Sequence, residues 1–385
     1  MFSSRLAWGA PKNPLTLLLE EMRARGEAIL DLTESNPTAA GIQYPVDEIA
    51  AALADPRALR YEPASAGILE AREAVARYYG GRAPVEKILL TASTSEAYAL
   101  LFKLLADPGD EVLVPRPSYP LFEFLAALES VRLVEYPLTY DGRWSIDLEA
   151  LERAVGLRTR AIILVNPNNP TGSFLKRAEF SRLAELCRAH DLALISDEVF
   201  SDYGFGADSE RMCTLAGQDL ALAFSLSGLS KVAGLPQLKL GWIAVSGPAP
   251  EAARAFERLE LIADTYLSVG APVQWATGRL LEMRAGIERQ ILERVCANRL
   301  YLERQMGPSS PWRILHAEGG WYAILEAPRI HTEEEWVLSL LREDRVLVQP
   351  GFFYDFEREA FLVISLLTPE ETFQAGLRRL LARAD

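Results

Sequence analysis

Seven short runs of almost unbroken apolar residues recur through the chain, and helical patterns lie between several of them. Strands that are apolar on both sides suit a sheet whose two faces are both covered by helices. The runs are residues 88–91, 111–114, 132–136, 161–165, 192–196, 221–225 and 241–245, and the intervening helical stretches include 69–79, 95–105 and 177–189. This order predicts an α/β fold built on a mostly parallel seven-stranded sheet flanked by helices.

The pattern changes after the last of these runs. Residues 249–303 are typical of helices, with a break at residues 270–272, and shorter apolar runs follow at 321–325, 346–348 and 362–365. Helical patterns lie between these runs, and another covers the region from Leu15 to Gly26. We therefore expect a large domain over residues 40–275 and a smaller α+β domain formed by residues 1–39 together with 276–385.

Charge and composition restrict the class of partner. The net charge is −13 at pH 7, which disfavours nucleic acid and anionic membranes as main partners. No apolar run approaches the roughly 20 residues that span a bilayer. The cysteines Cys187, Cys213 and Cys296 are odd in number and scattered, and the three histidines share no metal-ligand spacing. We expect a cytoplasmic protein without a metal site.

Three chemically distinctive residues come directly after three of the apolar runs. Asn169 lies in Asn-Pro-Asn-Asn-Pro-Thr-Gly, Asp197 in Ile-Ser-Asp-Glu, and Lys231 ends the run Ser-Gly-Leu-Ser-Lys. Ligands bind at the carboxyl ends of strands in parallel α/β sheets, so these side chains are expected at one edge. A lysine that forms a Schiff base and an aspartate that pairs with a pyridinium nitrogen are what pyridoxal 5'-phosphate requires. The pattern predicts this cofactor.

With these motifs in this order, the chain resembles the class I/II aminotransferases of fold type I, the pyridoxal-phosphate-dependent family that includes aspartate aminotransferase. The resemblance extends from about Asp31 to the last helix. It implies transfer of an amino group between an amino acid or amine and a 2-oxo acid through a Lys231 Schiff base, in a homodimer with shared active sites. Lyases, decarboxylases and oxidases of the same fold remain an alternative, and a non-catalytic cofactor-binding sensor is a third hypothesis.

The resemblance implies a role for each motif residue. Lys231 forms the Schiff base and moves a proton, Asp197 keeps the ring nitrogen protonated, and Asn169 donates to the phenolic oxygen. The remaining implied residues are Ser93, Thr94 and Ser95 at the phosphate, Tyr119 stacked on the ring, Ser230 beside the lysine, Lys239 at the phosphate, Tyr61 reaching the partner subunit's phosphate, and Ser35 and Asn36 in a loop over the substrate. Ordinary roles, such as a helix N-cap for Ser93 or core packing for Tyr119, stay open.

Four positions depart from the family pattern. Phe200 stands where a tyrosine usually donates to the phenolic oxygen, and Tyr203 is a candidate replacement. Lys239 replaces a phosphate-binding arginine, and Gly228 stands where many members have a phosphate-binding serine. Val363 occupies the position of the arginine that pairs with the substrate carboxylate. A buried unpaired carboxylate is costly, so either another cation binds it, or the substrate has no carboxylate there, or the strand register differs. We expect poor use of aspartate and glutamate in the usual geometry.

Overall fold

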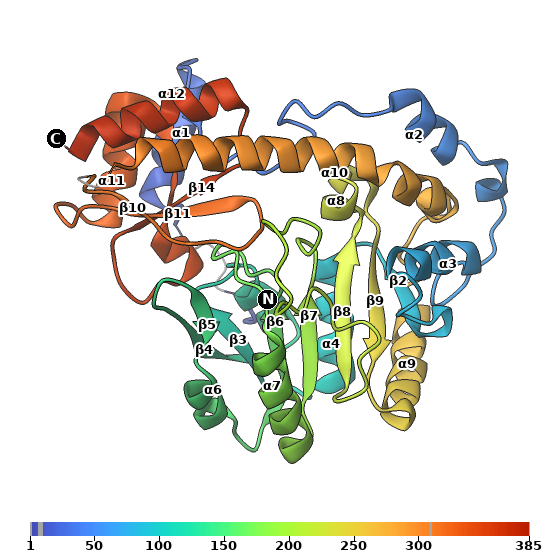
Figure 1. Ribbon diagram of the computed structural model, residues 1–385. Helices are drawn as coiled ribbons and strands as arrows, with labels where there is room; N and C mark the ends of the chain where they lie inside the picture. The colour runs from blue at the N-terminus through green and yellow to red at the C-terminus, as the bar shows by residue number, and fades with distance from the viewer. Residues whose placement is uncertain (1, 7–10, 308–309, 385) are drawn as a thin grey trace.

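The computed structural model describes residues 2–6, 11–307 and 310–384, and a large mixed sheet dominates it (Figure 1). In spatial order its strands are β2 (Ile88–Thr91), β9 (Gly241–Ser246), β8 (Ala223–Gly228), β7 (Ala193–Asp197), β6 (Thr159–Val165), β3 (Glu111–Arg116), β4 (Arg132–Tyr140) and β5 (Trp144–Ile146). The strands from β8 to β4 are parallel, whereas β9 is antiparallel to both neighbours. All seven predicted strands are present, and β5 adds an eighth, antiparallel to β4.

Alternate residues of the central strands pack against different layers of helices. In β6, Ala161 and Ile163 share a core with α4 (Thr94–Leu105), α5 (Phe122–Leu128) and α9 (Ala249–Asp264). Ile162 and Leu164 point the other way, into a core with α6 (Leu148–Ala154) and α7 (Arg177–His190). Because both faces are buried, these strands are apolar at nearly every position, which is the pattern seen in the sequence.

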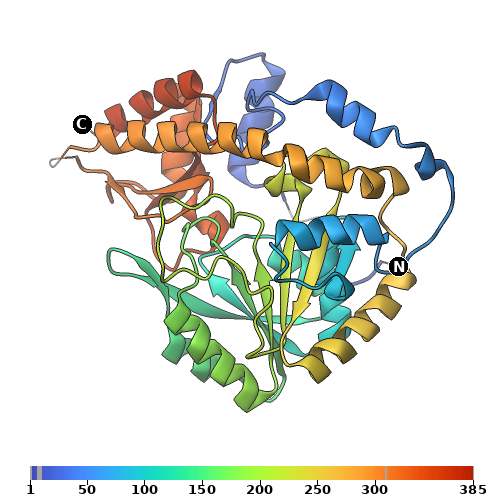
Figure 2. The same cartoon turned by 45° about the vertical axis from the view of Figure 1, so that its right-hand side comes forward.

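The 35-residue helix α10 (Ala271–Gln305) joins two hydrophobic cores, and Figures 1 and 2 show it crossing over the end of the large sheet. Ala276 and Leu280, in its first turns, pack with α3 (Leu69–Tyr78), α8 (Leu229–Val232) and β9. Ile291, Val295 and Leu302, farther along, belong to a second core that also holds residues from the N-terminal segment.

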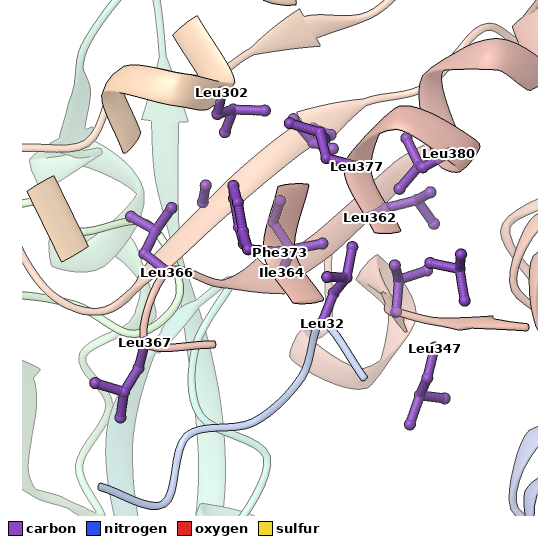
Figure 3. Close-up of a cluster of buried hydrophobic side chains, with 14 of the residues drawn as sticks. Leu32, Leu302, Leu347, Leu362, Ile364, Leu366, Leu367, Phe373, Leu377 and Leu380 are labelled. Carbon is purple, nitrogen blue, oxygen red and sulfur yellow. The ribbon is translucent and has the colours of Figure 1, made fainter. Parts of the chain in front are cut away.

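The second core is formed mainly by the C-terminal part of the chain and the N-terminal residues up to Ile42, and it also includes Phe200 and Tyr203 (Figure 3). Its four-stranded antiparallel sheet has the order β10 (Arg313–Ile314), β11 (Tyr322–Glu326), β14 (Phe361–Ser365) and β13 (Gln349–Pro350), and β1 (Leu30–Asp31) pairs with β12 (Val346–Leu347). The helices are α1 (Pro14–Ala24), α11 (Glu333–Ser339) and α12 (Glu370–Leu381), while α2 (Val46–Leu53) lies on the connection to the large sheet. The domain limits at residues 40 and 275 stay a prediction, and the cores cross both of them, since Ile42 belongs to the second core and Ala276 and Leu280 pack beside the large sheet.

Candidate active site

The carboxyl ends of three adjacent strands bring the three predicted residues to one edge of the large sheet. Asp197 is the last residue of β7, Asn169 lies in the turn after β6, and Lys231 lies in α8, directly after β8. The register sets Asp197 beside Val165 of β6 and Leu226 of β8. Because β6, β7 and β8 are parallel, their carboxyl ends open on the same side, where α/β folds bind ligands.

Burial perturbs both charged groups at this edge. It lowers the pKa of the Lys231 amine from its ordinary 10.5 to about 8, and the Asp197 carboxylate opposes this change. Burial also raises the pKa of Asp197 from 3.8 to about 6, although the Val199 N–H at 3.3 Å and the Tyr98 hydroxyl at 3.2 Å donate to the carboxylate. A coupled amine and carboxylate that both titrate near neutrality are typical of sites of proton transfer.

Aromatic rings surround the amine of Lys231. Its Nζ lies 4.9 Å from the ring centroid of Trp321 and 5.5 Å from that of Phe200. Trp321 packs edge-on against Phe200 and Tyr203, with ring centroids 5.1 and 5.0 Å apart. The Tyr203 hydroxyl donates to the Lys231 carbonyl oxygen at 2.6 Å. Tyr203 therefore fixes the backbone of Lys231, and its hydroxyl is already engaged, so it does not replace the donor that Phe200 lacks.

The start of helix α4 forms the expected anion site. Ser93 is its N-cap, and the Ser93 Oγ accepts a hydrogen bond from the Glu96 N–H at 3.1 Å. The N–H groups of Thr94 and Ser95 open the helix and have no intrahelical partner, which favours an anion there. The first residue of β9 passes close by, since a Cβ on Gly241 would lie 3.2 Å from the Ser93 carbonyl carbon.

Lys239, two residues before that contact, is exposed and adopts a left-handed backbone conformation with φ of 51°. Its ammonium makes no ion pair or hydrogen bond with any residue in the described part of the chain. A cation on the segment that leads to this contact suits a phosphate. Gly228 cannot contribute a serine hydroxyl to the same site. A Cβ at this position would lie 2.9 Å from both the Gly241 Cα and the Leu240 carbonyl oxygen, so the neighbouring strand excludes a side chain.

Asn169 and Tyr119 complete the edge. Asn169 is only 7% exposed, and its Oδ1 has no hydrogen-bond partner among the described residues. Buried polar atoms in native proteins are nearly always paired, so this unpaired oxygen fits a hydrogen-bond donor that binds beside it. Tyr119 is 43% exposed and packs against Phe122. Its pKa is raised first by burial and second by the negative charge of Asp197. Tyr119 therefore lies over the same site, and Ser230 adjoins Lys231 in α8.

The loop at Ser35 and Asn36 lies at the end of strand β14. Ser365 donates to the Glu34 carbonyl oxygen at 2.6 Å, and Ser35 is hydrogen-bonded to the hydroxyl of Tyr322. The Asn36 side chain is exposed, and its oxygen accepts hydrogen bonds from the Thr38 N–H and hydroxyl. Ser35 is thus the residue of the pair that faces the aromatic part of the site.

Val363 lies two residues before Ser365 on β14, where the sequence pattern expects a carboxylate-binding arginine. It is fully buried, opposite Ile324 and Gln349, in a cluster with Trp144, Tyr354, Phe356 and Phe361. Two nearby arginines are engaged elsewhere, since Arg345 pairs with Glu27 and Arg358 pairs with Glu326. An apolar aromatic cluster therefore occupies the place of the expected cation.

Tyr61 is 84% exposed and lines a cavity of about 270 Å³ beside the first turn of α4. Glu96 and Ser268 line the same cavity, and the Ser268 hydroxyl donates to the Glu96 carboxylate at 2.7 Å. The Tyr61 side chain therefore lies on the outer surface of the chain, next to the predicted phosphate site. A residue that contacts the phosphate of a partner subunit must lie in such a position.

Three residues that sequence reasoning did not assign to the site belong to it. Tyr98 donates to Asp197, Trp321 covers Lys231, and Tyr322 binds Ser35. Tyr98 follows Thr94 by four residues, so helical spacing alone places the two on one face of α4. Trp321 and Tyr322 carry no comparable signal, because their approach depends on how the second core packs against the first.

Comparisons with known proteins show the family to which the chain belongs. The sequence profile of the family "Aminotransferase class I and II" matches residues 27–380. The glutamate-pyruvate aminotransferase AlaA of Haemophilus influenzae is 28% identical over 92% of this chain and 90% of that protein. The alanine aminotransferase of Mycobacterium bovis is 29% identical over 96% of this chain and 88% of that protein.

Solved structures show the same architecture. An aminotransferase from Escherichia coli has a TM-score of 0.88 at 25% identity, covering 100% of this chain and 98% of that one. A mutant aspartate aminotransferase from Thermus thermophilus shares the fold with a TM-score of 0.84 at 24% identity, covering 99% of both chains. The fold is therefore that of the aspartate aminotransferases, and the chain is a member of the class I and II aminotransferase family, whose enzymes depend on pyridoxal phosphate.

Proposed function

We propose that Lys231 is the residue that links covalently to pyridoxal 5'-phosphate, and that the enzyme moves an amino group between an amino acid or amine and a 2-oxo acid. The observation that carries this proposal is the coupled pair of Lys231 and Asp197 at the sheet edge, each with a pKa near neutrality. The pair lies at the end of its strands, on the same sheet edge as the unpaired oxygen of Asn169.

Each residue of the edge has a distinct task. When bound, the cofactor supplies an aldehyde that condenses with amines and a ring that withdraws electrons from the bonds at the substrate Cα. The Lys231 amine, with a pKa of about 8, takes a proton from the substrate carbon and returns it. The Asp197 carboxylate, ionised above about pH 6, holds the proton on the ring nitrogen, and the Asn169 amide donates to the ring oxygen.

The cofactor phosphate is proposed to bind at the start of α4, with Ser93, Thr94, Ser95 and Lys239 as its ligands. Lysine supplies a charge but not the two-pronged contact of an arginine, and Gly228 adds no hydroxyl. We further propose a homodimer in which the partner subunit's copy of Tyr61 completes this site. The exposure of Tyr61 and its place beside α4 support that arrangement.

The substrate carboxylate is the least conventional part of the proposal. A charge-assisted pair contributes roughly 1.5–3 kcal/mol, so its absence at Val363 should raise the Michaelis constant by about tenfold or more. We therefore propose that dicarboxylic amino acids are poor substrates, because they bring a second carboxylate into a pocket that has one cation fewer. Steady-state kinetics with aspartate and 2-oxoglutarate test this. Efficient turnover of that pair would show that another cation binds the carboxylate.

We also propose a cytoplasmic location. The three cysteines, Cys187, Cys213 and Cys296, are all unpaired, which suits a reducing compartment. In the described part of the chain, no helix has both the length and the apolar character needed to cross a membrane, and no cluster of histidine, cysteine and acidic side chains is arranged to hold a metal ion.

Absorption spectra of the holoenzyme test the reaction type. With an aminotransferase, an amino donor bleaches the visible band of the bound cofactor, and a 2-oxo acid restores it. With a lyase or decarboxylase, product forms while the band persists, and with a sensor neither change occurs. A panel of amino acids and amines, followed by a panel of 2-oxo acids, therefore separates the three hypotheses and identifies the donor.

A further inference from the structure

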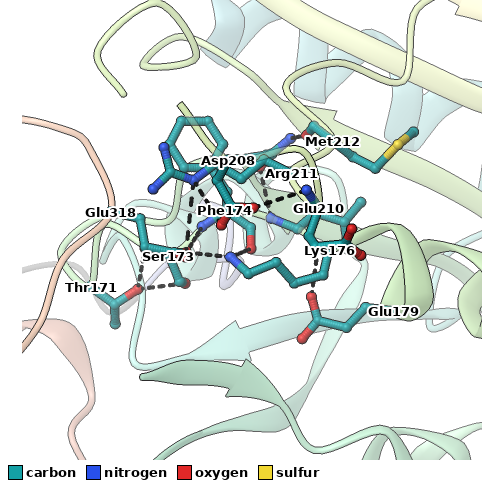
Figure 4. Close-up of polar contacts among 12 residues, drawn as sticks. Thr171, Ser173, Phe174, Lys176, Glu179, Asp208, Glu210, Arg211, Met212 and Glu318 are labelled. Carbon is teal, nitrogen blue, oxygen red and sulfur yellow. Dashed lines mark hydrogen bonds and ion pairs between the residues drawn. The ribbon is translucent and has the colours of Figure 1, made fainter. Parts of the chain in front are cut away.

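A buried ion cluster ties the two cores together next to the candidate site (Figure 4). Glu318 lies between β10 and β11 and is only 5% exposed. The Phe174 N–H donates to its Oε2 at 2.9 Å, and the ammonium of Lys176 donates to the same oxygen. The Nε of Arg211 lies 4.0 Å from the other carboxylate oxygen and 3.8 Å from Asp208. We call Glu318, Lys176 and Arg211 the Glu318 cluster.

Backbone contacts hold the same segment against the turn that carries Asn169. The Glu318 N–H donates to the Gly172 carbonyl oxygen at 3.1 Å, and the Phe205 N–H donates to the Glu318 carbonyl oxygen at 2.7 Å. A Cβ on Gly172 would lie 2.4 Å from the Gly319 carbonyl oxygen, so these two backbones approach more closely than any side chain permits. The segment at 317–320 therefore has one position relative to the turn after β6.

That segment leads directly into Trp321. The Gly320 N–H donates to the Tyr203 carbonyl oxygen at 2.9 Å, and the next residue covers the amine of Lys231. A shift of the segment would therefore move the indole away from the amine and admit water. We propose that Glu318 is a positioning residue, whose ion cluster with Lys176 and Arg211 holds Trp321 against Lys231.

The charges matter beyond the backbone contacts. Removing one partner of a buried ion pair leaves the other charge without compensation, which is strongly destabilising. Lys176 and Arg211 both lie on connections between strands of the large sheet, and Glu318 lies on the connection between β10 and β11 of the small one. The Glu318 cluster therefore joins the part of the chain that holds Asn169 to the segment that covers Lys231.

The inference rests on the proposed reaction at Lys231, so the test uses cofactor-free protein, where it can be read whether or not that reaction occurs. The variant is Glu318→Gln, which keeps an acceptor for the Phe174 N–H but removes the charge. Asp110→Asn is the control, because it breaks a 2.7 Å pair between a buried carboxylate and the partly exposed Arg160, at the opposite end of the strands. Lys176→Met is a second variant that keeps the carboxylate in place.

Two measurements separate positioning from general stability. Hydrogen exchange over residues 168–176 and 317–325 should become about tenfold faster or more in Glu318→Gln and Lys176→Met, but not in Asp110→Asn. At high pH, where the amine is uncharged in every protein, Lys231 should react faster with an amine-specific reagent in both variants. The midpoint of its pH profile should move to higher pH, because water that reaches the amine reverses the desolvation that lowers its pKa.

An unchanged Lys231 profile in both variants, or an equal change in Asp110→Asn, would overturn the proposal and leave the cluster with a structural role. Where Glu318→Gln does not fold, Lys176→Met decides. The proposed function is tested separately by adding pyridoxal phosphate and borohydride to the same samples. A cofactor fixed on a lysine other than Lys231 would overturn the proposed function without deciding the role of Glu318.

Discussion

The Lys231→Met substitution should stabilise the cofactor-free protein, because the native amine is held at a cost to folding. Burial lowers the pKa of Lys231 from 10.5 to about 8, and at 1.36 kcal/mol per pKa unit this is on the order of 3 kcal/mol at pH 7. Methionine fills a similar volume between Trp321 and Phe200 without a charge. Asp197 loses its cation, but Lys231 is the smallest of the causes that act on that carboxylate. We expect a net gain of roughly 2–3 kcal/mol.

The dependence on pH distinguishes this cause from better packing. Between about pH 8 and pH 10.5 the unfolded chain holds more protons on Lys231 than the folded chain, so wild-type stability rises with pH in that window. The advantage of Lys231→Met should therefore shrink, from about 3 kcal/mol at pH 7 to about 2 kcal/mol at pH 9. Urea unfolding of both proteins at several pH values measures it.

Lys12→Met is the control for this experiment, because Lys12 forms an exposed pair with Glu20 that water screens. We expect no pH-dependent change in that variant. A Lys231→Met protein that is less stable than wild type at pH 7, or a difference that stays constant to pH 9.5, would refute the reasoning that desolvation of the amine is the source of the effect.

Three further substitutions test the rest of the site. Asp197→Asn should keep the fold and the bound cofactor but lose most turnover, a cost of about 3–4 kcal/mol at the transition state, and near-normal kcat would exclude Asp197 as the ring partner. Lys239→Ala should weaken cofactor binding in an equilibrium titration while Lys239→Arg retains or tightens it, and equal affinity in all three proteins would remove Lys239 from the phosphate site. Gly228→Ser should lower stability by about 1–3 kcal/mol in thermal unfolding, since its Cβ meets backbone atoms at 2.9 Å, and a stable variant with tighter cofactor binding would contradict the steric argument.

The large sheet was predictable because its strands are buried on both faces and therefore read as continuous apolar runs. Strand β5 was not, since three residues in a hairpin with β4 leave too short a pattern. The seven-residue helices α5 and α6 went unpredicted for the same reason. The long helix α10 and its break from α9 were visible, because Gly270 and Pro272 interrupt an extended helical pattern.

Some residues of the site could be predicted from the neighbouring sequence, whereas others reach the site only through tertiary packing. Asp197, Asn169 and Lys231 could be predicted because each directly follows an apolar run, and parallel strands bring their ends together. Trp321 and Glu318 could not, because they come from a segment that reaches the site only when the second core packs against the first. The sequence pattern also indicated a weak phosphate site at Gly228, but only the contact with β9 explains why a serine is excluded there.

The most direct test of the account is to identify the residue that holds the cofactor. The purified protein is incubated with pyridoxal 5'-phosphate, reduced with borohydride, digested and analysed by mass spectrometry, alongside Lys231→Ala. We expect a visible absorption band in the wild type and a reduced cofactor on the peptide that contains Lys231, with both absent from the variant. A label on another lysine, or a band that survives in Lys231→Ala, would show that Lys231 does not hold the cofactor.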